Sequence, residues 1–596
     1  MIKISVVIPT FNRRHVLERT LPTLIAQDLA YEDFEVLVVD NGSTDGTAEF
    51  LTGFNPPFAF RSFQANRRGA SAARNVGIFA ALGKLILFLD DDLLAIPDLL
   101  SQHQAAHEGM KEQHVVHGPI FVSPDSAKTV TRYVTEQFYK EYNRSLTADM
   151  ELRYPEGIGP RIAMLSSLVN SSMPREALLR CGGFDEELRA AEDLDLGLRL
   201  WKMGLPFHCR PTAYVREFYV KSSGDYLRNQ AAASGAGDWR VVQKHPEYRP
   251  YSSLANFGET RIGRRWQRNL FLRFPLSPVP PMSAMLALER FFYDIEPLRK
   301  FGVRIFDLAE RIQRLRSGLQ AAASWERLVR DFDRRLPVLM YHHVGPSRPG
   351  VSKEWSITPE QFERHVRRIR RGGYETILPS NWLDWLREGK PLPRRPVLIT
   401  FDDGYGDTAQ YALPILRRYG MTAAVYVVTG RIGGTNTWDE AQGSGTLQLM
   451  TAEEIRNWAD QGIEFGAHSR SHSDLTTLAA ENLEEEVSGS RDDLALILGS
   501  PPVSFAYPFG EHTEAVREAV SRSFGLAFGS EEGQNFLRCE RHLLKRTYIG
   551  ACTSNLFLWL ILRFGSLKKL YEWRARIALR TRLRRIIGFQ LWSPSR

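Results

Sequence analysis

The chain contains 596 residues, more than one ordinary domain holds, and two or three large α/β domains account for this length. Hydrophobic residues make up 43% and charged residues 24%, which excludes a disordered or fibrous chain. The net charge of +8 lies in residues 563–596, where ten Lys and Arg accompany one Glu, so the remainder is close to neutral and nucleic acid binding is not expected.

The sequence carries no signal for membrane insertion or export. No run of 18 apolar residues is free of charge, which predicts no membrane-spanning helix. The N-terminus lacks the charged and apolar regions of a signal peptide. The four cysteines are scattered without a CxxC pair, so neither a disulfide framework nor a zinc–thiolate site is expected. These features favour a cytoplasmic protein.

In the first half, short β-branched runs alternate with a helical pattern. Residues 1–10, 35–40 and 85–89 are predicted strands, and residues 14–28 are a predicted helix with leucines on one face. This alternation predicts an α/β fold with a mostly parallel sheet covered by helices on both faces. Polar clusters at the carboxyl ends of these strands are where such sheets bind ligands.

The pattern changes in the middle of the chain, where residues 282–330 form a predicted amphipathic helix rich in Arg and Leu. A second strand-led series then begins, with strands at 396–401 and 422–429 and helices at 358–372, 408–419 and 451–461. The predicted divisions are residues 1–250, a helical connector at 251–333, a second α/β domain at 334–555 and a tail at 556–596.

Three adjacent carboxylates, Asp90, Asp91 and Asp92, end the strand at 85–89. Such a group is electrostatically unfavourable unless a cation balances it, and Mg²⁺ or Mn²⁺ accepts one or two carboxylates together with phosphate oxygens. The pattern favours a nucleotide-diphosphate site, with a solvated acidic turn as the alternative. Asp40 also ends a strand, where it either contacts a base or ribose or caps the following Asn-Gly turn.

Six segments in order strongly resemble the inverting family-2 glycosyltransferases of GT-A, Rossmann-like fold: VVIPTFNR, VVDNGSTDGT, GASAARNVGI, FLDDD, GGFDEEL and AEDLDLGLRL. The resemblance covers residues 3–220. It implies a nucleotide-sugar donor, such as a UDP-sugar, whose diphosphate Asp90 and Asp92 hold through Mg²⁺ or Mn²⁺. The implied donor-binding residues are Pro9, Thr10, Asn12, Asp40, Arg74, Asp90 and Asp91, with Asp92 as the metal ligand. For Arg74 a structural salt bridge is the alternative.

Glu192 and Asp193 match the ED motif of this family. An inverting transfer needs one base to take the proton of the acceptor hydroxyl, so a single carboxylate suffices. The resemblance assigns this role to Asp193, with Glu192 as the second candidate and an acidic helix start as the structural alternative. The QxxRW pattern of processive polymer synthases is absent, which favours transfer of one sugar over polymerisation.

The second half contains a metal-binding pattern. Asp402 and Asp403 follow the strand at 396–401, and His468 and His472 have the i,i+4 spacing that presents two imidazoles to one ion. One Asp and two His leave coordination positions open, which is typical of a catalytic metal. Neighbouring strand residues point to opposite sides, so the other carboxylate can face a bound water.

The segments PVLMYHHVG, ITFDDGY, HSRSH and FAYPFG resemble the polysaccharide deacetylase family (NodB homology, carbohydrate esterase family 4). The resemblance covers residues 336–550 and implies a distorted (β/α) barrel that hydrolyses an acetyl group on a glycan. It implies Asp402 as general base, and Asp403, His468 and His472 as ligands of Zn²⁺ or another divalent metal. Phe509 would supply an oxyanion N–H within the loop Tyr507, Pro508, Phe509 and Gly510.

The second half also departs from this family. Ala506 stands where the arginine that orients the base is expected, and neither a DxxDW motif nor a clear LxLxH motif is present. His542 and Arg546 lie in the region expected for the general-acid histidine, but not in its pattern. The sequence therefore leaves the proton donor unassigned.

The tail joins an apolar run, residues 556–562, to a basic segment interleaved with Leu, Ile, Tyr and Trp. This composition predicts an interfacial helix that binds the inner face of the cytoplasmic membrane, and a helix packed on the protein is the alternative.

Taken together, the motifs predict a bifunctional carbohydrate enzyme of cell-surface polysaccharide biosynthesis, which acts on a glycan or lipid-linked acceptor. One alternative is an active transferase with an inactive, glycan-binding deacetylase-like half. The other is a membrane-surface scaffold.

Overall fold

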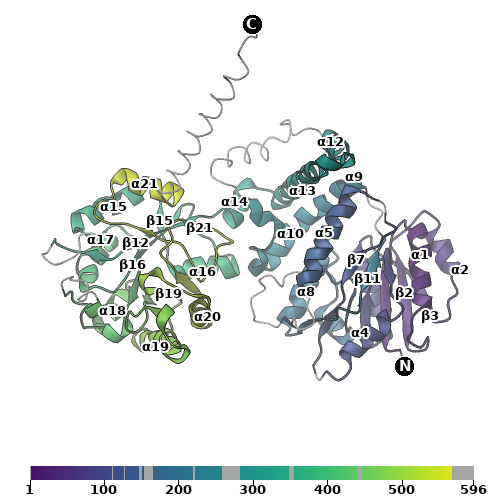
Figure 1. Cartoon of the computed structure of the whole chain (residues 1–596), viewed down its shortest axis with the longest axis horizontal. Coiled ribbons are helices and arrows are strands. Elements are labelled where there is room, and N and C mark those ends of the chain that lie inside the picture. The colour runs from purple at the N-terminus through teal and green to yellow at the C-terminus, as the bar shows by residue number, and fades with distance from the viewer. Residues whose placement is uncertain are drawn as a thin grey trace, which may run out of the picture. The chain divides into compact units, whose positions relative to one another are not determined.

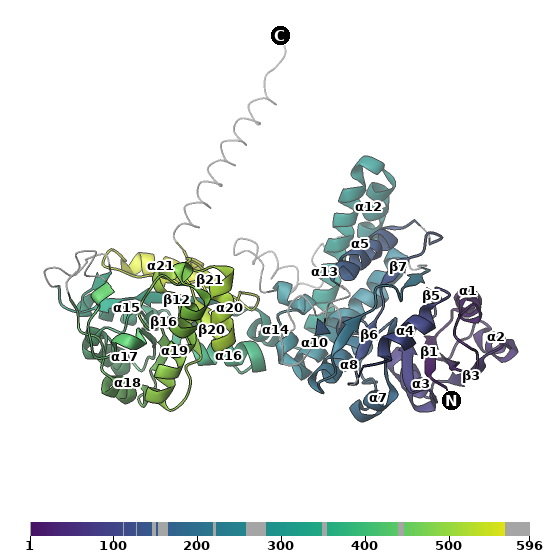
Figure 2. The same cartoon turned by 60° about the horizontal axis from the view of Figure 1, so that its bottom comes forward.

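The computed structural model describes residues 2–110, 112–126, 128–145, 151–152, 165–218, 222–257, 282–347, 355–438 and 446–566. The described chain divides into two compact units (Figures 1 and 2). The first contains residues 1–254 and 266–325, and the second contains residues 255–265 and 326–596. The basic part of the predicted tail, from residue 567 on, lies outside the described residues.

The first unit is built on an eight-stranded sheet of order β3-β2-β1-β4-β9-β6-β10-β8. Strands β3, β2, β1 and β4 are parallel, and β9 runs antiparallel to both of its neighbours. The bounds are β1 (Ile4–Thr10), β2 (Phe34–Asp40), β3 (Ala59–Gln64), β4 (Leu85–Phe88), β6 (Val115–His117), β8 (Glu151–Leu152), β9 (Ser171–Pro174) and β10 (Phe207–Cys209). A smaller sheet joins β5 (Leu93–Ala95), β11 (Val215–Glu217) and β7 (Ile120–Val122).

Helices cover the larger sheet, and the apolar residues of its strands β1, β2 and β4 are mostly buried, whereas the edge strand β3 is partly exposed. The predicted strand at 35–40 is fully buried, as the continuous β-branched run indicated. The helices of this unit are α1 (Arg14–Ile25), α2 (Thr47–Gly53), α3 (Ala70–Ala80), α4 (Leu99–His107), α5 (Val130–Ser145), α7 (Arg175–Cys181), α8 (Glu192–Lys202), α9 (Ser223–Asp225), α10 (Ala232–Lys244), α12 (Met282–Asp294) and α13 (Arg299–Ala322).

The segment predicted as one amphipathic helix at 282–330 forms three helices: α12, α13 and α14 (Trp325–Phe332). Pro297, which lacks a backbone N–H, lies in the short 3₁₀ turn between α12 and α13. Ala323 takes a left-handed conformation, with φ 53°, and ends α13. Helix α13 packs on α10, and Gly235 permits this approach because a Cβ there would lie 2.0 Å from the Arg314 carbonyl oxygen.

The second unit is built on a nine-stranded sheet with the path β20-β19-β18-β17-β16-β12-β21, where β15 pairs with β16 and β22 with β12. All pairs except β12 with β21 are parallel. The bounds are β12 (Leu336–Tyr341), β15 (Glu375–Thr376), β16 (Pro396–Phe401), β17 (Ala424–Val427), β18 (Glu464–Ala467), β19 (Ser504–Ala506), β20 (Leu526–Phe528), β21 (Gln534–Asn535) and β22 (Thr547–Tyr548).

A short two-stranded sheet, β13 (His343–Val344) with β14 (Ser356–Ile357), follows β12. The helices of this unit are α15 (Pro359–Arg371), α16 (Pro379–Glu388), α17 (Leu413–Arg418), α18 (Ala452–Ala459), α19 (Ala480–Leu498), α20 (Glu514–Ser523) and α21 (Asn555–Phe564). The alternation of parallel strands and helices confirms the predicted α/β class in both units and gives the second unit its barrel-like sheet.

Candidate active sites

In the first unit, the predicted donor-binding residues gather at one edge of the sheet. Strand β1 pairs with both β2 and β4, and the pairing sets Thr10 opposite Asp40. The carboxyl ends of these parallel strands therefore bring Thr10, Asp40 and the segment Asp90–Asp92 together, as the sequence predicted. Pro9 lies one residue before this edge, opposite Val39.

Asp40 and Asn12 are bonded mainly within the loop that follows β2. Both side-chain oxygens of Asp40 accept hydrogen bonds, from Ser43 and from Gln64. Asn12, at φ 52°, accepts from the Thr44 N–H at 2.7 Å, and its own N–H donates to Ser43. The two residues thus fix the turn after β2, and their contacts with a base stay predictions.

The three strand-end carboxylates have different surroundings. The Asp91 and Asp92 side chains are 7% and 5% exposed, and both lie within 2.7 Å of Nη1 of Arg13. Thr10 donates a hydrogen bond to Asp91, whose pKa is raised by burial against the opposing charge of Arg13. The Asp90 side chain is 39% exposed, so it is the most accessible of the three to a ligand.

Arg74 joins Asp90 to the predicted base. Its guanidinium lies 2.9 Å from Asp90, 3.0 Å from Glu192 and 3.4 Å from Asp193, and its side chain is 5% exposed. The salt bridge that the sequence left as an alternative for Arg74 is therefore present. Burial raises the pKa of Asp193, with Glu192 and Asp90 adding to the rise and Arg74 opposing it. A raised pKa suits a carboxylate that accepts a proton from a hydroxyl.

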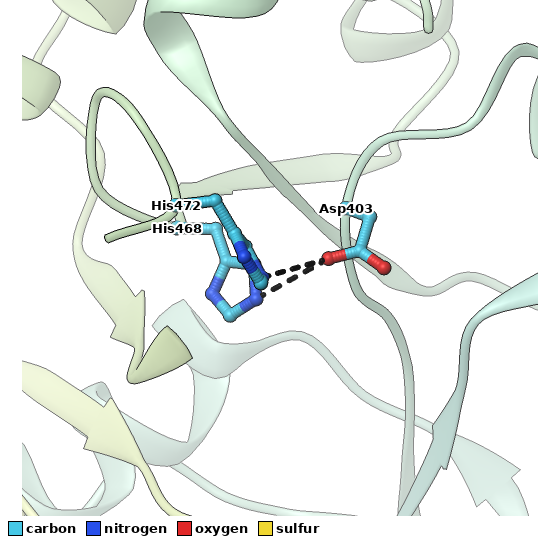
Figure 3. Close-up of side chains that lie close together, drawn as sticks. All are labelled: Asp403, His468 and His472. Carbon is cyan, nitrogen blue, oxygen red and sulfur yellow. Dashed lines mark ion pairs between the residues drawn. The ribbon is translucent and has the colours of Figure 1, made fainter. Parts of the chain in front are cut away.

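In the second unit, the predicted metal ligands meet at the carboxyl ends of β16 and β18 (Figure 3). Oδ1 of Asp403 lies 3.5 Å from Nε2 of His468 and 3.3 Å from Nε2 of His472. One ligand atom from each residue lies within 4.8 Å of the others, and all three residues are buried. The three converging donors fit a divalent metal with open coordination positions.

Further contacts hold these ligands in place. Nδ1 of His468 donates to the Ala506 carbonyl at 2.7 Å, which aims its Nε2 at Asp403. Asp403 and His472 have φ of 71° and 63°, a strained conformation that is typical of functional sites. Burial opposes ionisation of Asp403, but the two histidines hold its pKa well below the usual value.

Asp402 lies next to this cluster and is paired with a residue that sequence analysis did not assign. Nη1 of Arg546 donates to Oδ1 of Asp402 at 2.6 Å, and the two side chains are 1% and 3% exposed. Nε of Arg546 donates to the Gly529 carbonyl at 2.9 Å, which fixes the guanidinium. Arg546, which directly precedes β22 and lies 144 residues after Asp402, therefore makes the contact that was expected from an arginine at position 506.

His342 lies beside the same carboxylates and was also missed from the sequence. It follows the end of β12, where the Tyr341 carbonyl accepts the Asp402 N–H at 3.0 Å. Burial lowers the pKa of His342, and the charges of Asp403 and Asp402 oppose this shift. Its ring contacts Trp355 and Tyr548, with centroids 4.6 and 5.8 Å away. The signal for it was the YHH segment at a strand end.

The predicted oxyanion loop borders the metal ligands. The Phe509 ring lies 4.7 Å from that of His472, and Phe509 has φ 59°. The Tyr507 hydroxyl donates to the His542 carbonyl, and Pro508 is buried within the 3₁₀ turn that ends at Gly510. The His542 ring contacts the Phe524 carbonyl instead of the cluster.

Comparisons with known proteins agree with both halves. Residues 5–165 match the family model Glycosyl transferase family 2, and residues 389–528 match the model Polysaccharide deacetylase. Both resemblances are confirmed. One region of the chain therefore matches the family-2 glycosyltransferase model, and another matches the polysaccharide deacetylase model.

Each of the following relatives is similar to only one of the two regions of the chain. Over 266 residues, or 41% of this chain, it is 33% identical to the validoxylamine A glucosyltransferase of Streptomyces hygroscopicus subsp. jinggangensis (strain 5008). Over 186 residues, or 30% of this chain, it is 23% identical to the poly-beta-1,6-N-acetyl-D-glucosamine N-deacetylase of Staphylococcus aureus (strain MSSA476). The chain spans 62% and 61% of the lengths of these relatives.

Solved structures that are similar to parts of the chain come from both groups. The Streptococcus pyogenes deacetylase PplD in complex with acetate has a TM-score of 0.34 and 23% identity, over 38% of this chain and 98% of that one. S. aureus TarS residues 1–349 in complex with UDP has a TM-score of 0.32 and 18% identity, over 54% of this chain and 93% of that one.

Proposed function

We propose that the deacetylase region hydrolyses the acetyl group of an N-acetylated sugar in a glycan. The observation that carries this proposal is the cluster of Asp403, His468 and His472 next to the Asp402–Arg546 pair. A structural metal site needs no neighbouring buried carboxylate, whereas a hydrolytic site needs a base beside the metal. The companion alternative, a region that only binds glycan, does not explain why Asp402 is held by a buried arginine.

The residues of this region supply the proton transfers. Zn²⁺ or another divalent metal bound to the cluster would lower the pKa of its water and polarise the acetyl carbonyl. Asp402 accepts the proton of the attacking water, and the Phe509 N–H donates to the oxyanion. The proton that Asp402 has taken from the water passes to the leaving amine nitrogen. The amide C–N bond breaks, and acetate and a free amino sugar leave.

The transferase region is proposed to move one sugar from a nucleotide sugar, such as a UDP-sugar, to a glycan or lipid-linked acceptor with inversion. Asp90 is accessible at the sheet edge, and Arg74 connects it to Asp193. Mg²⁺ or Mn²⁺ at Asp90 and Asp92 would balance the donor diphosphate. Asp193 takes the proton of the acceptor hydroxyl, because burial makes it more basic than an ordinary carboxylate.

The two reactions fit one pathway of cell-surface polysaccharide biosynthesis, in which one region adds a sugar and the other exposes an amine. We place the protein at the inner face of the cytoplasmic membrane, with its C-terminal tail on the lipid surface. Among the described helices, none is long and apolar enough to cross a membrane.

The test is a mass-spectrometric screen of nucleotide sugars against soluble and lipid-linked acceptors, with N-acetylated glycans assayed in parallel for released acetate. Wild-type protein should add one hexose-type unit and remove one acetyl group. Asp193→Asn should lose only the addition, and Asp402→Asn only the loss of acetyl. If metal-loaded wild-type protein releases no acetate from any N-acetylated glycan, the glycan-binding alternative replaces the deacetylase proposal.

A further inference from the structure

Helix α21 has apolar residues on two opposite faces. Its inner face belongs to the core of the second unit, where Leu558, Ile561 and Leu562 are at most 3% exposed. Its outer face leaves three large apolar side chains in solvent: Leu556 at 62%, Phe557 at 38% and Trp559 at 41% exposure. The apolar run 556–562 therefore packs on the protein with one side only. The packed helix predicted as one alternative is present, and its other side is free to bind at an interface.

The outer face of α21 is held rigidly. Ser554 caps the helix by accepting the Phe557 N–H, and Gly565, at φ 81°, ends it. The Tyr374 hydroxyl donates to the Leu562 carbonyl at 3.1 Å. Nε2 of His365, on α15, donates to the Thr553 carbonyl at 2.9 Å. The exposed side chains thus stand on a fixed helix and not on a frayed chain end.

Exposed arginines lie on α21 itself and on the helix that packs against it. Helix α15 packs against α21, and both figures show the two helices side by side. Arg364 and Arg371 on α15, and Arg563 at the end of α21, are exposed. Within the described part of the chain, none of these three arginines forms an ion pair within 4.0 Å, although the charge of Glu360, one turn before Arg364 on α15, offsets that of Arg364 in part. Their positive charges are therefore available to an external anion.

The chain continues from this place with the same charge. Residues 567–596 contain nine more Lys and Arg and one Glu, and they begin two residues after Gly565. An apolar face that contains Trp, with exposed arginines on its own helix and on the neighbouring helix and a basic sequence after it, has the composition of a surface that binds at the lipid–water interface. A protein partner would need acidic groups around an apolar groove, whereas an anionic bilayer offers both features everywhere.

We propose that the outer face of α21, with Arg364, Arg371 and Arg563, binds the surface of an anionic bilayer. Phe557 and Trp559 enter the region between headgroups and acyl chains, and the arginines contact lipid phosphates. This names the apolar anchor for the membrane association proposed above, and it rests on none of the catalytic assignments. The folded deacetylase region, and not only the basic residues 567–596, would then be fixed at the membrane.

The test is co-sedimentation of the full chain with vesicles of phosphatidylcholine alone or mixed with phosphatidylglycerol. Wild-type protein should bind the mixed vesicles, and salt should weaken this binding. The double variant Phe557→Ser/Trp559→Ser should lower the affinity for the mixed vesicles by at least about tenfold, because apolar burial is lost. Leu496→Ser is the matched control, since Leu496 on α19 is 87% exposed and should not alter binding.

Two further measurements make the result decisive. Brominated lipids should quench Trp fluorescence in wild-type protein more than in Trp559→Phe, a variant that keeps an aromatic ring and the fold. Deletion of residues 567–596 should weaken binding but leave an effect of the double substitution. The proposal is overturned if wild-type protein binds neither vesicle, or if the double variant binds like the wild type, in which case the tail or another surface carries the association.

Discussion

The pair of Arg546 and Asp402 gives the sharpest prediction. Arg546→Met keeps the length and apolar part of the side chain but removes the guanidinium that lies 2.6 Å from Asp402. It also removes the donor to the Gly529 carbonyl and the cation that lies 5.8 and 5.9 Å from the rings of Tyr426 and Phe528. Asp402 is then left as a buried carboxylate without its cation.

The magnitude follows from burial. Both side chains are at most 3% exposed, and removal of one partner from a buried ion pair costs about 3–5 kcal/mol because the other charge stays in a medium of low dielectric. A small-domain stability is about 5–15 kcal/mol, so the second unit should remain folded but clearly weakened. Acetate release should fall even in the fraction of protein that stays folded, because Asp402 loses the group that orients it toward water.

The assay is urea unfolding together with metal analysis and acetate release. Arg522→Met is the control, since Arg522 and Glu484 are 60% and 46% exposed and such a pair is worth about 0–1 kcal/mol. Arg546→Lys should recover part of the stability but less of the turnover, because an ammonium cannot keep both hydrogen bonds of the guanidinium. If Arg546→Met keeps both stability and acetate release, the positioning role is wrong.

The remaining predictions separate the two regions and test burial. Asp193→Asn should lower sugar transfer about 100-fold or more and leave donor binding by calorimetry unchanged, and full transfer would remove Asp193 as the base. His468→Ala should lose bound metal and acetate release together, whereas Asp402→Asn should keep the metal and lose only turnover, as metal analysis of both proteins would show. Burial lowers the pKa of His103 to about 4. Because the unfolded chain binds this proton below about pH 6.5 and the folded chain only near pH 4, acidification across that window should cost about 3 kcal/mol of stability. His103→Gln should remove this part of the pH dependence of the urea midpoint, and an unchanged pH dependence would contradict the argument.

Sequence alone could predict the parts of both sites that follow from strand order. Asp40, Asp90, Asp402 and His468 each end or follow a strand of a largely parallel sheet, and such ends share one edge. The structure does bring the imidazoles of His468 and His472 to Asp403, but residues 468–472 form a loop, so their convergence comes from the loop conformation and not from helical i,i+4 geometry. The helical pattern predicted at 282–330 is confirmed, but Pro297 and the left-handed Ala323 divide it into three helices instead of one.

The missed residues are those whose contacts depend on long-range packing. Arg546 reaches Asp402 across 144 residues, and its place in the sequence carries no periodicity or spacing that points to this contact. Arg13 is similar, since its guanidinium reaches Asp91 across 78 residues. A family pattern locates an arginine by its position along the chain, whereas the carboxylate requires only a guanidinium within hydrogen-bond distance. The alanine at position 506 therefore breaks the family motif, but Asp402 still has a guanidinium beside it, that of Arg546.

The same reasoning changes the argument for a metal in the first unit. Three adjacent carboxylates predict a balancing cation, but Arg13 already contacts Asp91 and Asp92, and Arg74 contacts Asp90. Arg74 also has to balance Glu192 and Asp193, so two guanidiniums face five carboxylates. If all five are ionised, three negative charges are left, and a donor diphosphate would add to them. The arginines balance part of this charge within the unit, and the negative charge that remains is the physical basis of the divalent cation proposed to bind with the donor diphosphate.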